Sequence, residues 1–139
     1  MKILVIDGQG GGLGKLLVAG IKKALPEADL TCVGTNSIAT AAMIKAGADR
    51  GATGENSAVV CSRDADVIVG PCGIVIADAL LGEITPAMAV AVGQSRAKRL
   101  LIPLDLCDNI VVGTGAKPMP VLVDEAVKKL VELAHSSDI

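Results

Sequence analysis

Short runs of apolar residues alternate along the chain with longer segments in which apolar residues recur at helical spacing. The first run, residues 3–6, is continuously apolar and ends at Asp7-Gly8, as expected for a central parallel strand buried on both faces. Over residues 13–25 apolar positions recur at helical intervals, until Pro26 interrupts the pattern. This order predicts a strand followed by a helix that covers one face of a sheet.

The same alternation continues through the rest of the chain. Further strands are expected at residues 30–34, 66–70, 100–104 and 110–112, and further helices at 38–46, 57–63, 74–81, 86–94 and 123–134, with a polar loop at 47–56. Alternating strands and helices form parallel crossovers. We therefore predict an α/β fold: a three-layer Rossmann-like open parallel sheet of about five strands with helices on both faces. A length of 139 residues predicts one domain, residues 1–139.

Composition narrows the class of protein. Apolar residues make up 51% of the chain and charged residues 20%, a globular balance, and Phe, Tyr and Trp are absent. A net charge of -2 gives no basic surface, and without aromatic rings there are no stacking platforms, so we expect no nucleic-acid partner. The chain opens directly with a strand and contains no apolar stretch of 18 residues, so we expect a cytoplasmic protein without a membrane partner.

Cysteine and histidine are not spaced for metal binding. Cys32, Cys61, Cys72 and Cys107 lie far apart in the sequence, and the single histidine, His135, is near the C-terminal end. This spacing fits no zinc motif, and we expect free thiols in a reducing compartment and no metal site.

The segment between the first strand and the first helix carries the strongest functional signal. Five glycines fall within residues 8–14, and a lysine follows. Glycine lets a ligand approach the main chain closely, and the free amides at the start of a helix attract an anion. The lysine can add a charge-assisted contact. We predict that a nucleotide phosphate is held by Gly8, Gln9, Gly10, Gly11, Gly12, Leu13, Gly14 and Lys15.

Two glycine motifs of dinucleotide-binding proteins overlap this segment. The best match, Gly8-x-x-x-Gly12-x-Gly14, resembles the glycine motif of short-chain dehydrogenases and related Rossmann proteins. The G-x-G-x-x-G fingerprint matches at Gly8 and Gly10 but then meets Leu13. Short-chain dehydrogenases also need a catalytic tyrosine, which this chain lacks, so the resemblance concerns binding and not their reaction.

Two other interpretations of the glycine segment compete with the dinucleotide motif. A P-loop is disfavoured, because Gln9 stands at its leading glycine position and Leu16 stands where a hydroxyl would bind magnesium. The glycines can also serve only a tight turn and close packing, without a ligand. Against this, each glycine costs roughly 0.5 to 1 kcal/mol wherever a side chain would have fitted, and a turn rarely needs five.

Thr35 and Asn36 follow the second predicted strand, where dinucleotide-binding domains often carry an acidic residue for the ribose. Both can hydrogen-bond a sugar, although Asn36 can equally cap the next helix. The missing acid is compatible with a 2'-phosphate, but sequence spacing does not place the nearest basic residues, Lys45 and Arg50. The choice of nucleotide therefore stays open at this point.

Two loops supply further candidate contacts. Arg50 lies in the polar loop and can pair with a second anion, or form an ion pair within a solvated loop. Gly70, Pro71 and Gly73 end the third predicted strand, where main-chain contacts to a cofactor are expected. Cys72 as a nucleophile is disfavoured, because no histidine is available at this edge to activate it.

Four segments together resemble a known family. These are residues 7–15, 34–40, 47–56 and 84–90. They resemble an uncharacterised family of small bacterial proteins classed as a domain of unknown function, and the resemblance covers essentially the whole chain. It implies a bacterial, cytoplasmic, Rossmann-like protein, but it implies no activity and no catalytic residues.

Two hypotheses about function follow. The first is a nucleotide- or dinucleotide-binding protein, with NAD(P) among the candidate cofactors, that forms a homo-oligomer through the apolar segments 74–81 and 88–92. The alternative is a small enzyme that acts on a nucleotide or phosphorylated metabolite, with Asp78, Glu83 or Arg50 as participants. The turn at residues 70–73 followed by Asp78 is similar to that of nucleotide hydrolases with a lysine-decarboxylase-like fold.

Overall fold

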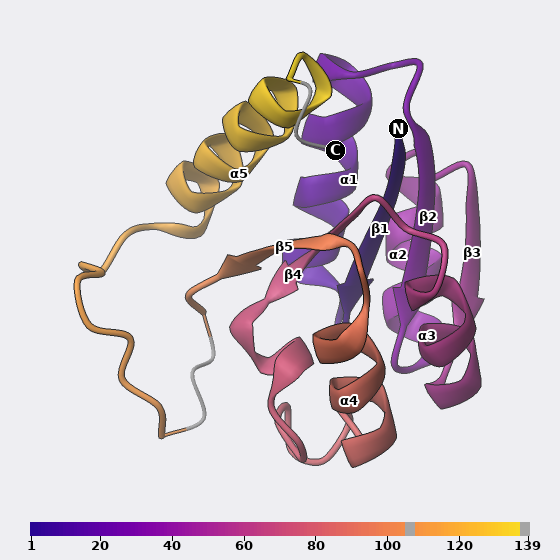
Figure 1. Ribbon diagram of the computed structural model, residues 1–139, viewed down its shortest axis with the longest axis vertical. Coiled ribbons are helices and arrows are strands. Elements are labelled where there is room, and N and C mark those ends of the chain that lie inside the picture. Colours follow the sequence, from indigo (N-terminus) through magenta and orange to yellow (C-terminus); the bar gives the residue numbers. More distant parts are fainter. Residues whose placement is uncertain (105–107, 137–139) are drawn as a thin grey trace.

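Parallel strands and the helices that connect them form three layers (Figure 1). The computed structural model describes residues 1–104 and 108–136. The elements follow in the order β1 (Lys2–Asp7), α1 (Gly12–Ala24), β2 (Asp29–Gly34), α2 (Ser37–Lys45), β3 (Arg50–Thr53), α3 (Glu55–Ser62), β4 (Val67–Pro71), the 3-10 helix η1 (Cys72–Val75), α4 (Pro86–Gln94), β5 (Lys98–Ile102) and α5 (Met119–Ala134).

The strands form one parallel sheet in the order β3-β2-β1-β4-β5. The chain first builds the sheet outward from β1 to β3, then returns to the other side of β1 and continues with β4 and β5. The strand order therefore reverses between β1 and β4. In open sheets of this kind, ligands bind outside the carboxyl ends of the strands at this reversal.

Each face of the sheet carries its own hydrophobic core. Ile3 and Val5 of β1 point to the face covered by α1, α2 and α5, whereas Leu4 and Ile6 point to the face covered by α3 and α4. All four side chains are buried. This burial on both faces explains the continuous apolar run of β1, because neither face of a central strand meets water.

The predicted fold class is confirmed: the chain is a Rossmann-like three-layer α/β structure with five parallel strands among the described residues. One strand lies where a loop was expected. Residues 50–53 form β3, a short and largely exposed edge strand that pairs with β2 from Thr31 to Gly34. Its polar sequence carries no apolar alternation, because backbone pairing and not burial holds it in the sheet.

The prediction of a helix at residues 74–81 is wrong. The chain forms only η1 and then a series of turns, in which Asp78, Leu80 and Leu81 all adopt left-handed backbone angles. Ile74 and Leu80 are nevertheless buried in the core beside α4. Their spacing therefore reflects burial at two points of an irregular segment and not the face of a helix.

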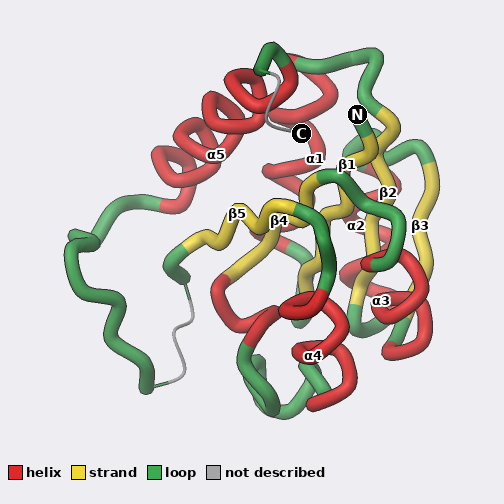
Figure 2. The backbone as a smooth tube through the Cα atoms, viewed as in Figure 1, coloured by secondary structure: helices red, strands yellow, loops and turns green. Residues whose placement is uncertain are grey.

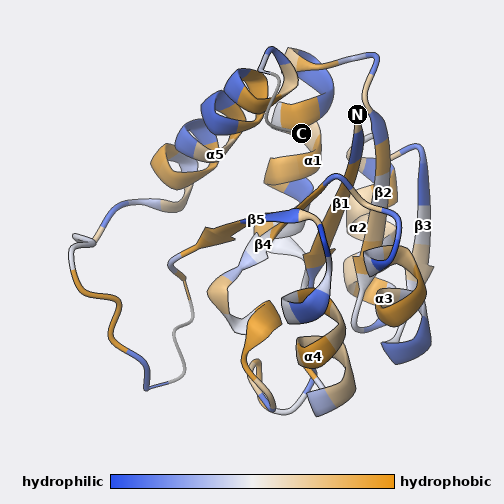
Figure 3. Cartoon of the chain, in the orientation of Figure 1, coloured by the Kyte–Doolittle hydropathy of each residue, from blue (hydrophilic) through white to orange (hydrophobic). Residues whose placement is uncertain are grey.

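The prediction of a strand at residues 110–112 is also wrong. Residues 108–118, which lead into α5, form a loop that projects from the body of the protein (Figure 2), and residues 110–112 form no strand. Ile110 and Val112 are 90% and 92% exposed, and this apolar stretch is visible on the loop in Figure 3. No helix among the described residues is long and apolar enough to cross a membrane.

Candidate functional site

The glycine-rich turn lies at the carboxyl end of β1, and a buried carboxylate organises it. The two oxygens of Asp7 accept hydrogen bonds from the amides of Gly8 and Gly14, with N–O distances of 2.8 and 2.6 Å. The amide of Gly11 donates to the carbonyl of Gly8 at 2.9 Å. Asp7 therefore fixes the turn and the first residues of α1 to the end of the strand.

Packing accounts for three of the five glycines. A Cβ at Gly8 would lie 2.7 Å from Thr35 Oγ1, and one at Gly14 would lie 2.6 Å from Met43 Sδ and 2.9 Å from Asp7 Cβ. Gly11 has a φ of 74° and lies against the backbone of α2. A side chain at any of these positions would force its neighbours to move. These three glycines are therefore required by the fold itself.

Neither packing nor backbone conformation requires the other two glycines. A Cβ at Gly10 or at Gly12 would meet no atom within 4 Å, and neither residue has a left-handed backbone. Gly12 and Leu13 begin α1, so their amides have no partner within the helix. Lys15 is exposed in the same turn of the helix. The open side of the turn thus presents backbone amides and a cation to solvent.

A second carboxylate binds the other side of the turn. Oε1 of Glu83 accepts hydrogen bonds from Thr35 Oγ1 at 2.5 Å, from Asn36 Nδ2 at 2.7 Å and from the Gln9 amide at 3.0 Å. Asn36 Nδ2 also donates to the Gln9 carbonyl at 2.9 Å, and its Oδ1 caps α2 through the Ala39 amide. The structure therefore brings the predicted residues Thr35 and Asn36 to the glycine turn, and Asn36 also caps the helix.

The hydrogen bonds to Glu83 favour its ionised form. Burial alone would raise the pKa of its carboxyl, but the bonds from Thr35, Asn36 and the Gln9 amide outweigh burial and hold the pKa below the ordinary value of 4.5. Gln9 itself adopts a left-handed φ of 50°, an unfavourable angle for a residue with a side chain. Its amide and carbonyl are both engaged, which holds this strained conformation in place.

The predicted residues Gly70, Pro71 and Gly73 lie at the end of β4 and in η1. Gly70, Pro71 and Gly73 are all buried. A Cβ at Gly70 would meet the carbonyl oxygen of Ile6, so close strand packing accounts for this glycine. Burial raises the pKa of the Cys72 thiol, which opposes formation of the nucleophilic thiolate. The main-chain contacts that Gly70, Pro71 and Gly73 were expected to make with a cofactor stay a prediction.

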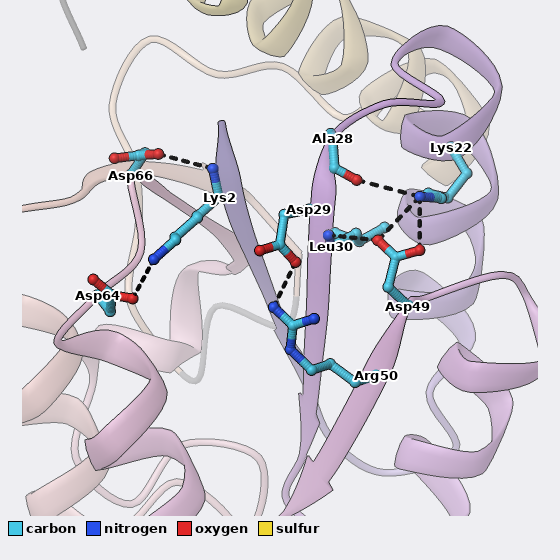
Figure 4. A network of polar contacts seen from close by, with 9 residues as sticks. All are labelled: Lys2, Lys22, Ala28, Asp29, Leu30, Asp49, Arg50, Asp64 and Asp66. Carbon is cyan, nitrogen blue, oxygen red and sulfur yellow. Dashed lines mark hydrogen bonds and ion pairs between the residues drawn. The ribbon is translucent and has the colours of Figure 1, made fainter.

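Arg50 does not join the other predicted residues. It begins β3 and therefore lies at the amino edge of the sheet, opposite the glycine turn, where its guanidinium binds Asp29 at 2.6 Å (Figure 4). Lys2 and Asp64 form a second ion pair at 2.6 Å at the same edge. A cleft of about 350 Å³ opens between these pairs over Leu4 and is separate from the glycine turn.

The residues named for an enzyme do not form an acid–base pair. Asp78 is exposed, Glu83 is engaged with the glycine turn, and Arg50 is at the far edge. The described residues include no group of three or more His, Cys, Asp and Glu side chains that could hold a metal ion. The sequence named Glu83 only as a participant in the alternative enzyme, and it did not predict that Asp7 or Glu83 would hold the glycine turn. For Asp7, the sequence pattern that could have indicated this role is the Asp7-Gly8 pair directly after a buried strand.

A Rossmann-like sheet with a glycine turn at its strand reversal defines a broad class of ligand-binding α/β proteins. Within that class, the chain belongs to the family described as "Domain of unknown function (DUF3842)", which matches residues 2–135. No curated protein matches the chain. A solved structure with a similar arrangement is a dodecameric FMN-dependent Ubix-like decarboxylase from Escherichia coli O157:H7, at 18% identity and a TM-score of 0.46, covering 94% of this chain and 76% of that one. Similarity at this level says nothing about whether this chain binds flavin or how it assembles.

Proposed function

We propose that the protein binds a nucleotide or dinucleotide, with a phosphate held on the open side of the glycine turn. The groups that would hold it are the amides of Gly10, Gly12 and Leu13, with Lys15 supplying positive charge. Helix N-termini bind phosphate because their free amides and the helix dipole both favour an anion. The strand reversal beside β1 is also the place where this fold binds ligands.

One observation carries the proposal. Gly10 and Gly12 have room for a side chain and backbone angles that other residues adopt, so nothing within the described residues requires them to be glycine. A ligand that approaches the main chain at these positions would require it. The turn-only interpretation accounts for Gly8, Gly11 and Gly14, but it leaves these two glycines without a reason.

Thermal unfolding across a nucleotide panel tests the proposal. The panel contains NAD(H), NADP(H), FMN, ATP and AMP. A ligand at 100 times its dissociation constant adds about 2.7 kcal/mol to the free energy of unfolding. For a chain of this length, an unfolding entropy of about 2.1 cal/mol/K per residue converts that gain to a rise in Tm of about 9 °C. We expect one class of nucleotide to give such a shift.

Variants connect that shift to the turn. Gly12→Val should leave the protein folded, because the position is open, and should remove the shift by covering the amides. Gly93→Val is the matched control, since Gly93 in α4 also meets no atom within 4 Å but lies in another helix. The proposal fails if no nucleotide shifts Tm, or if Gly12→Val binds as tightly as Gly93→Val.

A further inference from the structure

Glu83 places a carboxylate beside the end of β2, where the residues that follow the strand in sequence are neutral. The residues that follow β2 are Thr35 and Asn36, which are neutral, and Glu83 reaches both from the connection between β4 and α4, 48 residues after Thr35 in the chain. In dinucleotide-binding sheets, an acidic residue at the end of β2 accepts hydrogen bonds from the ribose. Glu83 brings that chemical group to the same place from a different loop.

The two oxygens of Glu83 are not equally occupied. Oε1 receives three donors, whereas Oε2 receives only a second, 3.1 Å contact from the Gln9 amide. An ionised carboxylate has about four acceptor positions over its two oxygens. Oε2 therefore keeps capacity to accept from a hydroxyl beside the glycine turn, and the donors on Oε1 fix its direction.

The segment that carries Glu83 is held in an unfavourable conformation. Leu80 and Leu81 both have left-handed φ values, 57° and 56°, although neither is glycine. The Asp78 amide donates to the Ile84 carbonyl at 2.7 Å, and Leu80 and Ile84 are buried in the core. Strain of this kind persists where the surroundings over-determine it and is concentrated at functional sites. Here the hydrogen bond between Asp78 and Ile84 and the burial of Leu80 and Ile84 hold the turn that carries Glu83.

The segment that follows β2 supplies no cation to accompany this carboxylate. Residues 35–44, which follow the strand and form most of α2, contain neither lysine nor arginine. Dinucleotide-binding domains that accept a 2'-phosphate supply a basic residue there. A 2'-phosphate would instead lie against the negative charge of Glu83.

We propose that Glu83 accepts a hydrogen bond from a ribose hydroxyl of the bound nucleotide, so that the site takes nucleotides with free 2'- and 3'-hydroxyls and excludes 2'-phosphorylated ones. This inference rests on the proposed function, because the glycine turn must hold the phosphate of the same nucleotide. It assigns Glu83 a role in specificity, in addition to joining the loop to the turn.

Titration calorimetry with ADP-ribose and 2'-phospho-ADP-ribose tests the assignment. The wild type should prefer ADP-ribose by about 100-fold, since like charges would meet in the other complex. Glu83→Gln should weaken ADP-ribose binding by roughly 10- to 100-fold, the effect of losing a charged hydrogen bond, and should reduce the preference. Glu55→Gln is the control: Glu55 is exposed at the start of α3, and its carboxylate accepts from Thr85 at 2.6 Å. It should change neither affinity.

The outcomes separate this inference from the proposed function. If the wild type binds both ligands equally, or if a folded Glu83→Gln keeps full affinity and preference, Glu83 only joins the loop to the turn and the nucleotide site stands without it. If the wild type binds no nucleotide, both proposals fail. Circular dichroism establishes whether Glu83→Gln is folded, and the wild-type preference decides the question if the variant is not.

Discussion

Substituting alanine for Gly14 should lower the free energy of unfolding, whereas the same substitution at Gly12 should leave it unchanged or raise it. At Gly14 the new methyl would lie 2.6 Å from Met43 Sδ and 3.0 Å from the Asp7 oxygen that accepts the Gly14 amide. Met43 can move its sulfur, but the backbone-proximal Cβ of Asp7, at 2.9 Å, cannot easily move. Overpacking of this kind destabilises a protein by about 1 to 3 kcal/mol.

At Gly12 the methyl would meet no atom within 4 Å, in the first turn of α1. Alanine restricts the unfolded chain and favours the helix, so Gly12→Ala should gain up to about 1 kcal/mol. Gly10→Ala should be close to neutral for the same reason of space.

Thermal and urea unfolding measure this contrast. At about 3.4 °C per kcal/mol, Gly14→Ala should lower Tm by roughly 3 to 10 °C, whereas Gly12→Ala should leave it unchanged or raise it by up to about 3 °C. Parallel urea curves should give the same order of midpoints with similar slopes. If Gly12→Ala destabilises the protein as much as Gly14→Ala, Gly12 is required by the fold, and the reasoning that assigns it to a ligand is refuted.

Four further predictions follow from the site and the surface. Lys15→Ala should weaken nucleotide binding by roughly 3- to 10-fold at low salt and less at high salt, without loss of stability, as calorimetry at two ionic strengths would show. Arg50→Ala should leave that affinity unchanged and cost less than about 1 kcal/mol in urea unfolding, because its ion pair is exposed at the other edge. Because folding lowers the pKa of Glu83, its contribution to stability should be present at neutral pH and be lost as pH falls below about 4.5, and Glu83→Gln should flatten that acid limb in urea titrations. Finally, we expect a homo-oligomer by light scattering at micromolar concentration, and replacement of the exposed Ile110 and Val112 by serine should shift it toward monomer.

The two segments expected to form the homo-oligomer interface are only partly exposed. Residues 74–81 and 88–92 were expected to leave apolar surface uncovered, but Ile74, Leu80 and Met88 are buried within the chain. Within the same two segments, Leu81 and Val90 are nevertheless 97% and 53% exposed, and Ile110 and Val112 on the loop before α5 add further exposed apolar surface. The oligomer itself stays a prediction for light scattering to test.

Local sequence patterns predicted most of the sheet. The apolar runs of β1 and β4 are buried on both faces, and their composition identified the first as a central strand and the second as a strand. β3 was missed because pairing with β2 defines it, and pairing leaves no signature in four mostly exposed residues. The same omission misplaced Arg50, which opens β3 and so faces the amino edge of the sheet.

The sequence predicted only the part of the site that follows from the order of adjacent strands. The glycine turn, Thr35 and Asn36 follow adjacent strands, and parallel strands bring their carboxyl ends together. Glu83 lies 74 residues from Gln9, in a segment whose left-handed turns have no recognisable sequence pattern. Only the folded chain shows that this carboxylate meets the turn.

The most direct test of phosphate binding at the glycine turn is a titration of 15N-labelled protein with the nucleotide that gives the largest thermal shift. The largest changes in amide chemical shift should occur at Gly10, Gly12 and Leu13, with no change at Arg50 and Gly51 in the cleft at the amino edge. Changes centred on that cleft, with Gly10 and Gly12 unmoved, would contradict the account and place the ligand at the other end of the sheet.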